Sequence, residues 1–88
     1  MQINYERKFF KDLAAVSSKS RLQIETFITQ SFSNPDKILK LGKLEKLKGY
    51  QHYYKIRIGD YRIGIKIQND IISFERVLHR KEIYKKFP

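Results

Sequence analysis

The middle of the chain alternates between apolar and polar residues, which is the period of two that a half-buried β-strand requires. The alternation runs through residues 53–58 and again through residues 61–68. Gly59-Asp60 lies between the two runs, and glycine supplies the positive φ angle that a two-residue hairpin turn needs. The pattern therefore predicts a β-hairpin whose isoleucine side chains share one face.

A further strand is predicted directly after this hairpin. Asn69-Asp70 is a second two-residue turn signal, and an apolar-rich segment follows it over residues 71–79. Apolar side chains occur at both sets of alternate positions in this segment, which is typical of a strand inside a sheet. We therefore expect a strand at residues 71–79, with Phe74 and Leu78 on the same face.

The first third of the chain changes from a short alternating segment to helical spacing. Residues 1–5 alternate as a strand does, whereas the apolar residues of 6–16 recur at the spacing of a helix. Ser17-Ser18 interrupts this spacing and can cap a second helix over residues 19–32. The apolar stripe of that helix consists of Ile24, Phe27, Ile28 and Phe32. Two helices joined so briefly are expected to form an antiparallel hairpin.

Two segments have weaker patterns. Residues 36–48 are compatible with an irregular loop, a short helix or a strand around 44–47, and we expect an extended segment leading to a turn at Gly49-Tyr50. Residues 80–87 contain one or two helical turns. The predicted order is β-α-α-β-β-β, an α+β domain whose antiparallel twisted sheet has a two-helix hairpin on one face and a short C-terminal helix or tail. The isoleucine face should meet the helices, and the opposite face should stay open.

The charge of the chain narrows its possible partners. The 88 residues suit one domain, and 19 Lys or Arg against nine Asp or Glu give a formal net charge of +10. Such a balance favours a phosphate polymer, an anionic membrane surface or an acidic protein. The sequence has no cysteine, no apolar run long enough to span a bilayer and no signal-peptide core. We therefore expect a cytoplasmic domain without a membrane partner.

The polar face of the predicted hairpin gathers cations. It carries Lys55, Arg57, Arg62 and Lys66. Because cross-strand neighbours lie about 5 Å apart, these like charges repel one another, which favours a face that receives an anion. His52 and His79 have no cysteine or carboxylate cluster beside them, so we expect no metal site and no cofactor.

The segment LEKLKGYQHYYKIRIGDYRIGIKI and the ending VLHRKEIYKKF resemble the RelE/ParE toxin superfamily of bacterial toxin–antitoxin modules. The resemblance covers nearly the whole chain, residues 1–88, as one RelE-like domain. Its RelE branch implies an endoribonuclease that cuts mRNA, usually within the ribosomal A site. The site that it implies is a set of basic residues on the open sheet face plus a tyrosine near the C-terminus. Matching motifs place that site at Lys55, Arg57, Arg62, Arg80 and Tyr84.

These residue types suit RNA cleavage by the 2′-hydroxyl of the substrate. That reaction requires a base, cations that stabilise the phosphorane, and an acid for the leaving oxygen. Arg62 and Arg80 can bind phosphate oxygens with paired donors, whereas Arg57 stays protonated and is a poor base. The base is then one of Lys55, His79 and Tyr84. Tyr84 could instead stack on a nucleobase.

Basic residues and one tyrosine outside this set are also expected to bind RNA. They are Lys46, Lys48, Tyr53, Lys66 and Lys81. The resemblance implies an acidic antitoxin protein as partner, mRNA and the ribosome as targets, and a toxin that is monomeric when alone. Two alternatives are a ParE-like toxin that inhibits DNA gyrase without catalysis and a non-catalytic RNA-binding domain. Both nuclease and gyrase inhibitor share this fold, so the fold does not separate them.

Overall fold

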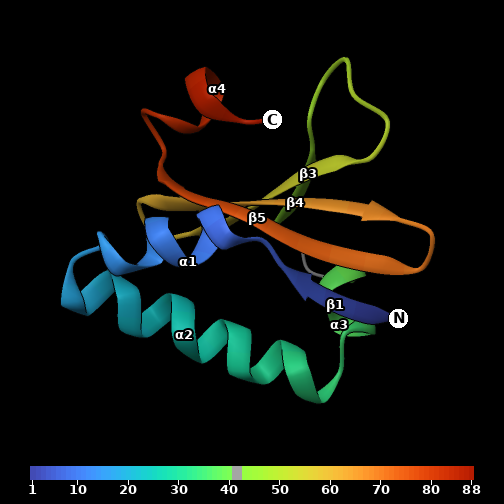
Figure 1. The fold of residues 1–88 in the computed structure, drawn as a ribbon, viewed down its shortest axis with the longest axis horizontal. Helices are drawn as coiled ribbons and strands as arrows, with labels where there is room; N and C mark the ends of the chain where they lie inside the picture. The colour runs from blue at the N-terminus through green and yellow to red at the C-terminus, as the bar shows by residue number, and fades with distance from the viewer. Residues whose placement is uncertain (41–42) are drawn as a thin grey trace.

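In the described part of the chain, five strands form one sheet with the spatial order β1-β5-β4-β3-β2 (Figure 1). The computed structural model describes residues 1–40 and 43–88. The strands are β1 (Gln2–Tyr5), β2 (Leu44–Lys46), β3 (Tyr53–Ile58), β4 (Tyr61–Gln68) and β5 (Ile71–His79). The helices are α1 (Arg7–Ala14), α2 (Ser18–Ser33), α3 (Asp36–Leu39) and α4 (Ile83–Lys86). This arrangement confirms the predicted α+β class.

Neighbouring strands are antiparallel except for β1, which pairs with β5 in the parallel direction. The predicted turns join the strands. Gly59 has a φ of +58°, and Asn69 and Asp70 have φ angles of +56° and +63°. Asn and Asp enter this left-handed region more readily than other residues with a side chain. The turn residues therefore fix the limits of β3, β4 and β5 where the sequence predicted them.

The helices cover the isoleucine face of the sheet. Ile56 of β3 and the β4 residues Ile63 and Ile65 have no exposed surface. They pack with Phe9 of α1 and Ile24 of α2, and α2 lies below the sheet in the view of Figure 1. Fully burying a side chain of this size contributes about 1.5–3 kcal/mol. The core is therefore on the face predicted from the alternation.

The segment before the hairpin contains both a helix and a strand. α3 places Ile38 in the core, and β2 pairs with β3 at the edge of the sheet. Gly49 has a φ of +85° in the turn that follows β2, as expected. Residues 41–42 and the side chain of Phe32 lie outside the described part of the structure.

β5 contains a register shift that the alternation did not indicate. Gly64 pairs with Arg76, whereas the next residue, Ile65, pairs with Phe74. Glu75 is therefore an additional residue in β5, which makes the irregularity a β-bulge. A bulge bends the strand and leaves its extra residue without a cross-strand partner.

The bulge changes which residues of β5 reach the core. Val77 joins the cluster on the helix side, together with Phe74. Leu78 lies in a separate cluster on the opposite face. The prediction that Leu78 shares a face with Phe74 is therefore wrong, because the extra residue reverses the alternation of the positions that follow.

The face opposite to α1 and α2 is partly covered, which corrects the expectation that it stays open. A second apolar cluster consists of Leu78, Ile83, Phe87, Leu47 and Tyr53. α4, which lies above the sheet in Figure 1, supplies Ile83, and Phe87 follows it. The C-terminal segment therefore packs on the middle of this face and leaves polar surface on both sides.

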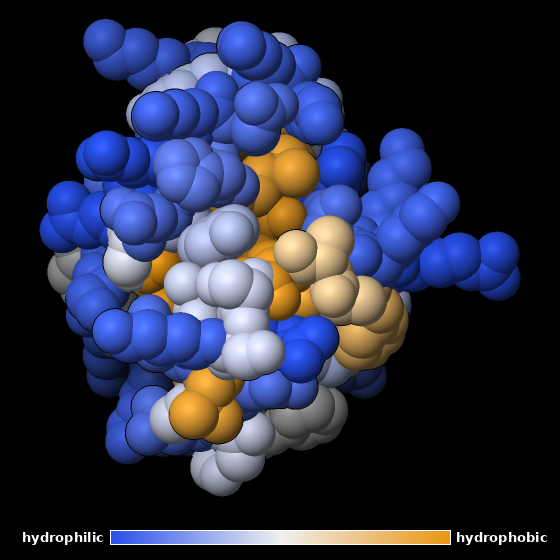
Figure 2. Space-filling model, turned by 90° about the vertical axis from the view of Figure 1, so that its left-hand side faces the viewer, coloured by the Kyte–Doolittle hydropathy of each residue, from blue (hydrophilic) through white to orange (hydrophobic). Residues whose placement is uncertain are grey.

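Charged and polar side chains dominate the rest of the surface. On the side shown in Figure 2, hydrophilic residues surround a smaller apolar area. Among the side chains that the structure describes, the large apolar residues that are exposed are Phe10, Leu22, Leu39, Tyr50 and Tyr84. Of the helices that the structure describes, none has both the length and the apolar composition to cross a bilayer.

Candidate functional site

A groove lies on the sheet face opposite to α1 and α2, between β2, β3 and α4. Its volume is about 470 Å³. Its lining residues are Glu45, Lys46, Leu47, Lys48, Tyr50, Lys55, Tyr84 and Phe87. Because three of these side chains are lysines and one is a carboxylate, the groove suits an anionic ligand.

Lys55 is at the centre of this groove and is only 8% exposed. Its Nζ donates a hydrogen bond to Tyr84 Oη and lies 4.0 Å from the centre of the Tyr84 ring. Glu45 Oε2 lies 3.8 Å from the same Nζ, because the register of β2 and β3 pairs Glu45 with Lys55. A nearly buried cation beside a carboxylate and a phenol is an arrangement suited to acid–base chemistry.

Three arginines lie near the turn that joins β3 and β4. Arg57 and Arg62 are cross-strand partners on the face of Lys55. Arg62 Nη1 donates a hydrogen bond to the carbonyl oxygen of Gly59 at 2.9 Å, which fixes the direction of its guanidinium. Arg80 Nε lies 3.9 Å from Asp60 Oδ1 in the same turn. The structure therefore brings a group of exposed or half-exposed guanidinium groups to one end of the face that carries Lys55.

His79 is not brought into the groove. It pairs with Tyr61, and the two ring centres are 5.5 Å apart. Because Tyr61 packs against the helix-side core, His79 lies on the other face of the sheet from Lys55. Its Nδ1 accepts a hydrogen bond from the backbone N–H of Lys81 at 3.2 Å. Of the three base candidates, Lys55 and Tyr84 line the groove and His79 does not.

The residues expected to bind RNA occupy three places. Lys46 and Lys48 line the groove itself. Lys66 Nζ lies 5.7 Å from the centre of the Tyr53 ring, further along the same face. Lys81 is exposed after the end of β5. Their cations therefore extend the positive surface beyond the groove without forming one cluster.

Sequence reasoning missed Glu45. The signal that could have found it is the short apolar-charged-charged run of β2, set against the alternation of β3. Aligning Leu44 with Ile56 places the Glu45 carboxylate directly across from Lys55. That alignment required knowing that β2 pairs with β3, which the ambiguous pattern of this segment did not indicate.

Two residues at the bulge of β5, Glu75 and Arg76, have shifted pKa values. Burial, followed by the charge of Glu6, raises the pKa of Glu75, although Lys66 acts in the opposite direction. The hydrogen bond with Asp12 raises the pKa of Arg76. Arg76 Nε and Nη2 donate to the two Asp12 oxygens at 2.7 and 3.1 Å, and this ion pair joins α1 to β5.

Among the described residues, no group of three or more His, Cys, Asp or Glu is arranged to hold a metal ion.

Phe87 packs over Gly64 and holds α4 against the sheet. A substitution at Gly64 therefore tests whether this contact positions Tyr84 in the groove. A Cβ at Gly64 would lie 2.8 Å from the Phe87 ring. Gly64→Ala is therefore expected to displace Phe87 and to separate Tyr84 from Lys55, at a cost of about 1–3 kcal/mol. Amide chemical shifts and thermal unfolding measure the two effects.

The matched control for this change is a double variant. Combining Gly64→Ala with Phe87→Leu removes the clash, so the amide shifts around Tyr84 should return toward those of the unchanged protein. If Gly64→Ala alone leaves the surroundings of Tyr84 unchanged, Phe87 does not position α4.

Comparison with known proteins shows matches along nearly the whole chain. The sequence profile of the family described as "ParE toxin of type II toxin-antitoxin system, parDE" matches residues 3–84. Toxin RelE3 of Methanocaldococcus jannaschii is 46% identical over 89 residues, with 100% of both chains covered. The family match includes β2 through β5 and Tyr84, and the match with RelE3 includes the whole groove.

Solved structures share the fold. The RelB-RelE antitoxin-toxin complex from Methanococcus jannaschii matches with a TM-score of 0.79 at 43% identity, covering 97% of this chain and 99% of that one. The E. coli DinJ-YafQ toxin-antitoxin complex matches with a TM-score of 0.72 at 17% identity, covering 94% of this chain and 96% of that one. At 17% identity the likeness shows the fold alone.

Proposed function

Because the chain belongs to the ParE/RelE family of toxins from toxin–antitoxin modules, we propose that it is an endoribonuclease that cleaves mRNA at the ribosome. The observation that carries the proposal is the placement of Lys55 in a cationic groove, in contact with Tyr84 and Glu45. Arg57 and Arg62 lie on the same face and can bind the neighbouring phosphate. The resemblance of the sequence to the RelE branch supports the same reaction.

The reaction that these groups support is attack of a ribose 2′-hydroxyl on the adjacent phosphorus. The bond from phosphorus to the 5′-oxygen breaks, which leaves a 2′,3′-cyclic phosphate on one fragment and a 5′-hydroxyl on the other. Glu45 takes the hydroxyl proton in place of the base candidates Lys55 and Tyr84, because a carboxylate accepts protons whereas an ammonium group and a phenol donate them. Tyr84 gives a proton to the leaving oxygen, and the Lys55 ammonium stabilises the charge that develops between them. The arginines hold the phosphate in line.

A single 2′-deoxy substitution tests this route. Placed on the 5′ side of the cut, it should abolish cleavage and leave binding nearly unchanged, because it removes the nucleophile but few phosphate contacts. Cleavage of an end-labelled mRNA on programmed ribosomes, with analysis of both new termini, measures the result. The control carries the deoxy nucleotide on the 3′ side of the cut and should be cleaved normally. Normal cleavage of the first substrate would show that water is the nucleophile.

Inhibition of DNA gyrase without catalysis is the second candidate function. The ParE description of the matching family favours it. Primer extension on cellular transcripts after induction separates the two candidates. Discrete new 5′ ends support the nuclease, whereas intact transcripts with arrested replication support the gyrase inhibitor.

An acidic antitoxin is the protein partner in this proposal. The related RelB-RelE and DinJ-YafQ structures are toxin complexes with antitoxins. The net charge of +10 suits an acidic partner, because complementary charge speeds association. We further propose that the toxin is a single-domain cytoplasmic protein. When its antitoxin is absent, it is a monomer.

A further inference from the structure

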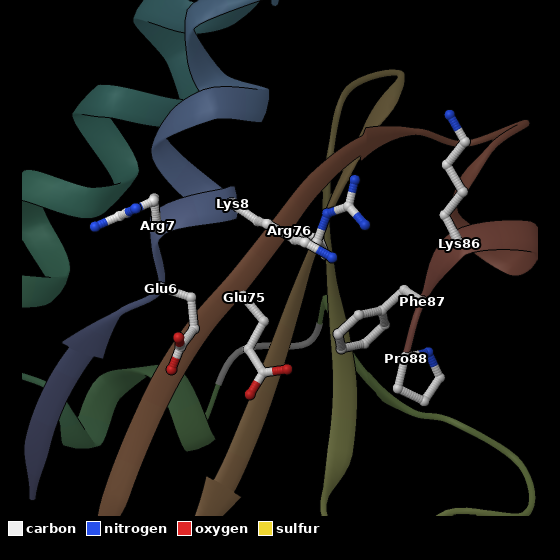
Figure 3. A pocket seen from close by; sticks show the side chains of 8 residues that line it. All are labelled: Glu6, Arg7, Lys8, Glu75, Arg76, Lys86, Phe87 and Pro88. Carbon is white, nitrogen blue, oxygen red and sulfur yellow. The ribbon is translucent and has the colours of Figure 1, made fainter.

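A second cleft lies beside Phe87 (Figure 3). It shares Phe87, and no other lining residue, with the Lys55 groove. Its volume is about 530 Å³. Its lining residues are Glu6, Arg7, Lys8, Glu75, Arg76, Lys86, Phe87 and Pro88. Figure 3 shows the carboxylates of Glu6 and Glu75 on one side of the cleft and the two C-terminal rings on the other. The cleft therefore combines two carboxylates, four cationic side chains and an apolar wall.

The bulge of β5 places opposite charges next to each other in this cleft. Consecutive residues of a regular strand point to opposite faces. At the bulge, Glu75 and Arg76 together oppose Gly64, and both side chains line the cleft. Bulges often redirect side chains next to active sites in this way. A carboxylate and a guanidinium group thus lie side by side in β5, between the start of α1 and the C-terminal residues.

Both groups have unused hydrogen-bonding capacity. Arginine has five N–H donors, and the ion pair with Asp12 uses two donors of Arg76. Within residues 1–40 and 43–88, the structure shows no hydrogen bond or ion pair for the carboxylate of Glu75. Burial also raises the pKa of Glu75, which shows that its carboxylate is partly removed from water. Partly buried polar groups without partners favour a ligand that supplies them.

We propose that this cleft binds a guanine base of the RNA strand and contributes to base specificity. Guanine presents two donors, N1–H and the N2 amino group, to the Glu75 carboxylate, and its O6 and N7 accept hydrogen bonds from Arg76. Adenine has an amino group where guanine has O6, and uracil has no exocyclic amino group. Phe87 and Pro88 contact the apolar surface of the base. Glu75 and Arg76 therefore select guanine by its pattern of donors and acceptors.

The position of the cleft fits an RNA strand that also occupies the groove. The pairing of β3, β4 and β5 places Lys55, Gly64 and Arg76 in one row across the sheet. Two strand spacings, about 10 Å, separate the backbones of Lys55 and Arg76. A nucleotide near the cleaved one can thus reach the cleft. This inference rests on the proposed function, because it requires that RNA occupies this face.

Binding of RNA that cannot be cleaved tests the inference. The probes are 2′-O-methyl uridine pentamers whose central base is guanine, hypoxanthine, adenine or uracil, and fluorescence anisotropy measures their affinities. The toxin should bind the guanine pentamer about 10-fold more tightly than the uracil pentamer. The hypoxanthine pentamer, which lacks only the N2 amino group, should lose most of this preference.

Glu75→Gln supplies the matched variant. It keeps the size of the side chain, but one of the two acceptor oxygens becomes an NH2 donor, which then meets one of the two guanine donors. It should abolish the preference for guanine and leave affinity for the uracil pentamer unchanged. Glu25→Gln, which replaces an exposed carboxylate of α2, should leave the preference intact.

Two results would overturn the inference. These are equal affinity for the guanine and uracil pentamers, and a guanine preference that persists in Glu75→Gln. A toxin that cleaves mRNA on programmed ribosomes without a guanine preference refutes this inference alone. A toxin that binds the guanine pentamer selectively but cleaves no mRNA on programmed ribosomes refutes the proposed nuclease instead.

Discussion

Replacing Lys55 with methionine is expected to lower the rate of RNA cleavage at least about 100-fold without unfolding the protein, because removing one preorganised donor from a developing charge typically costs about 100- to 1,000-fold in kcat. Lys55 is 8% exposed, and methionine preserves most of the apolar stem that packs there. The variant loses the ammonium group that contacts Tyr84 and Glu45. Single-turnover cleavage and thermal unfolding, measured on the same preparation, separate catalysis from stability.

Lys19→Met is the matched control for this experiment. Lys19 is an exposed residue of α2, on the helix side of the molecule. Its replacement removes the same charge and should leave cleavage unchanged. Tyr84→Phe refines the result, since it removes the hydroxyl and keeps the ring. A Lys55→Met variant that cleaves at the normal rate would show that the groove is not the catalytic site.

Ile56→Asp is expected to unfold the protein. Ile56 has no exposed surface and packs in the main core. An unpaired carboxylate at this position costs several kcal/mol. The whole domain has only about 5–15 kcal/mol of stability to lose. Circular dichroism with urea unfolding should therefore show a large loss of the folded population in water.

Arg57→Asp provides the comparison within the same strand. Arg57 follows Ile56 in β3, points to the other face and is exposed. Its replacement puts a carboxylate opposite Arg62 and relieves a pair of like charges, so stability should change by less than about 1 kcal/mol. An equal loss of stability in the two variants would contradict the assignment of the two faces.

Local patterns predicted the hairpin well because two independent signals agree there. The period of two identifies the strands, and Gly59-Asp60 and Asn69-Asp70 mark where they end. The bulge at Glu75 escaped prediction because a glutamate fits a polar position of an uninterrupted strand equally well. Only the pairing of β5 with β4 shows that one residue is extra. The face assigned to Leu78 was wrong for this reason.

The part of the candidate site that lies on the β3–β4 hairpin could be predicted from the sequence. Alternation alone places Lys55, Arg57 and Arg62 on one face, and the structure agrees. Glu45 and His79 depend on pairing with distant segments, Glu45 through β2 and His79 through the bulge of β5. The position of Tyr84 over Lys55 depends on how α4 packs, which follows from contacts between distant residues. Single-sequence patterns do not contain that information.

The parallel pairing of β1 with β5 sets the order in which this toxin can fold while it is being made. The ribosome releases the N-terminal part first, but β1 has no partner until residues 71–74 emerge. Pairing of segments so distant in sequence slows folding, because the chain between them must first be ordered. Tyr84 emerges later still. The nascent chain therefore has no assembled groove during nearly all of its own translation, and products truncated before β5 lack both the partner strand of β1 and Tyr84.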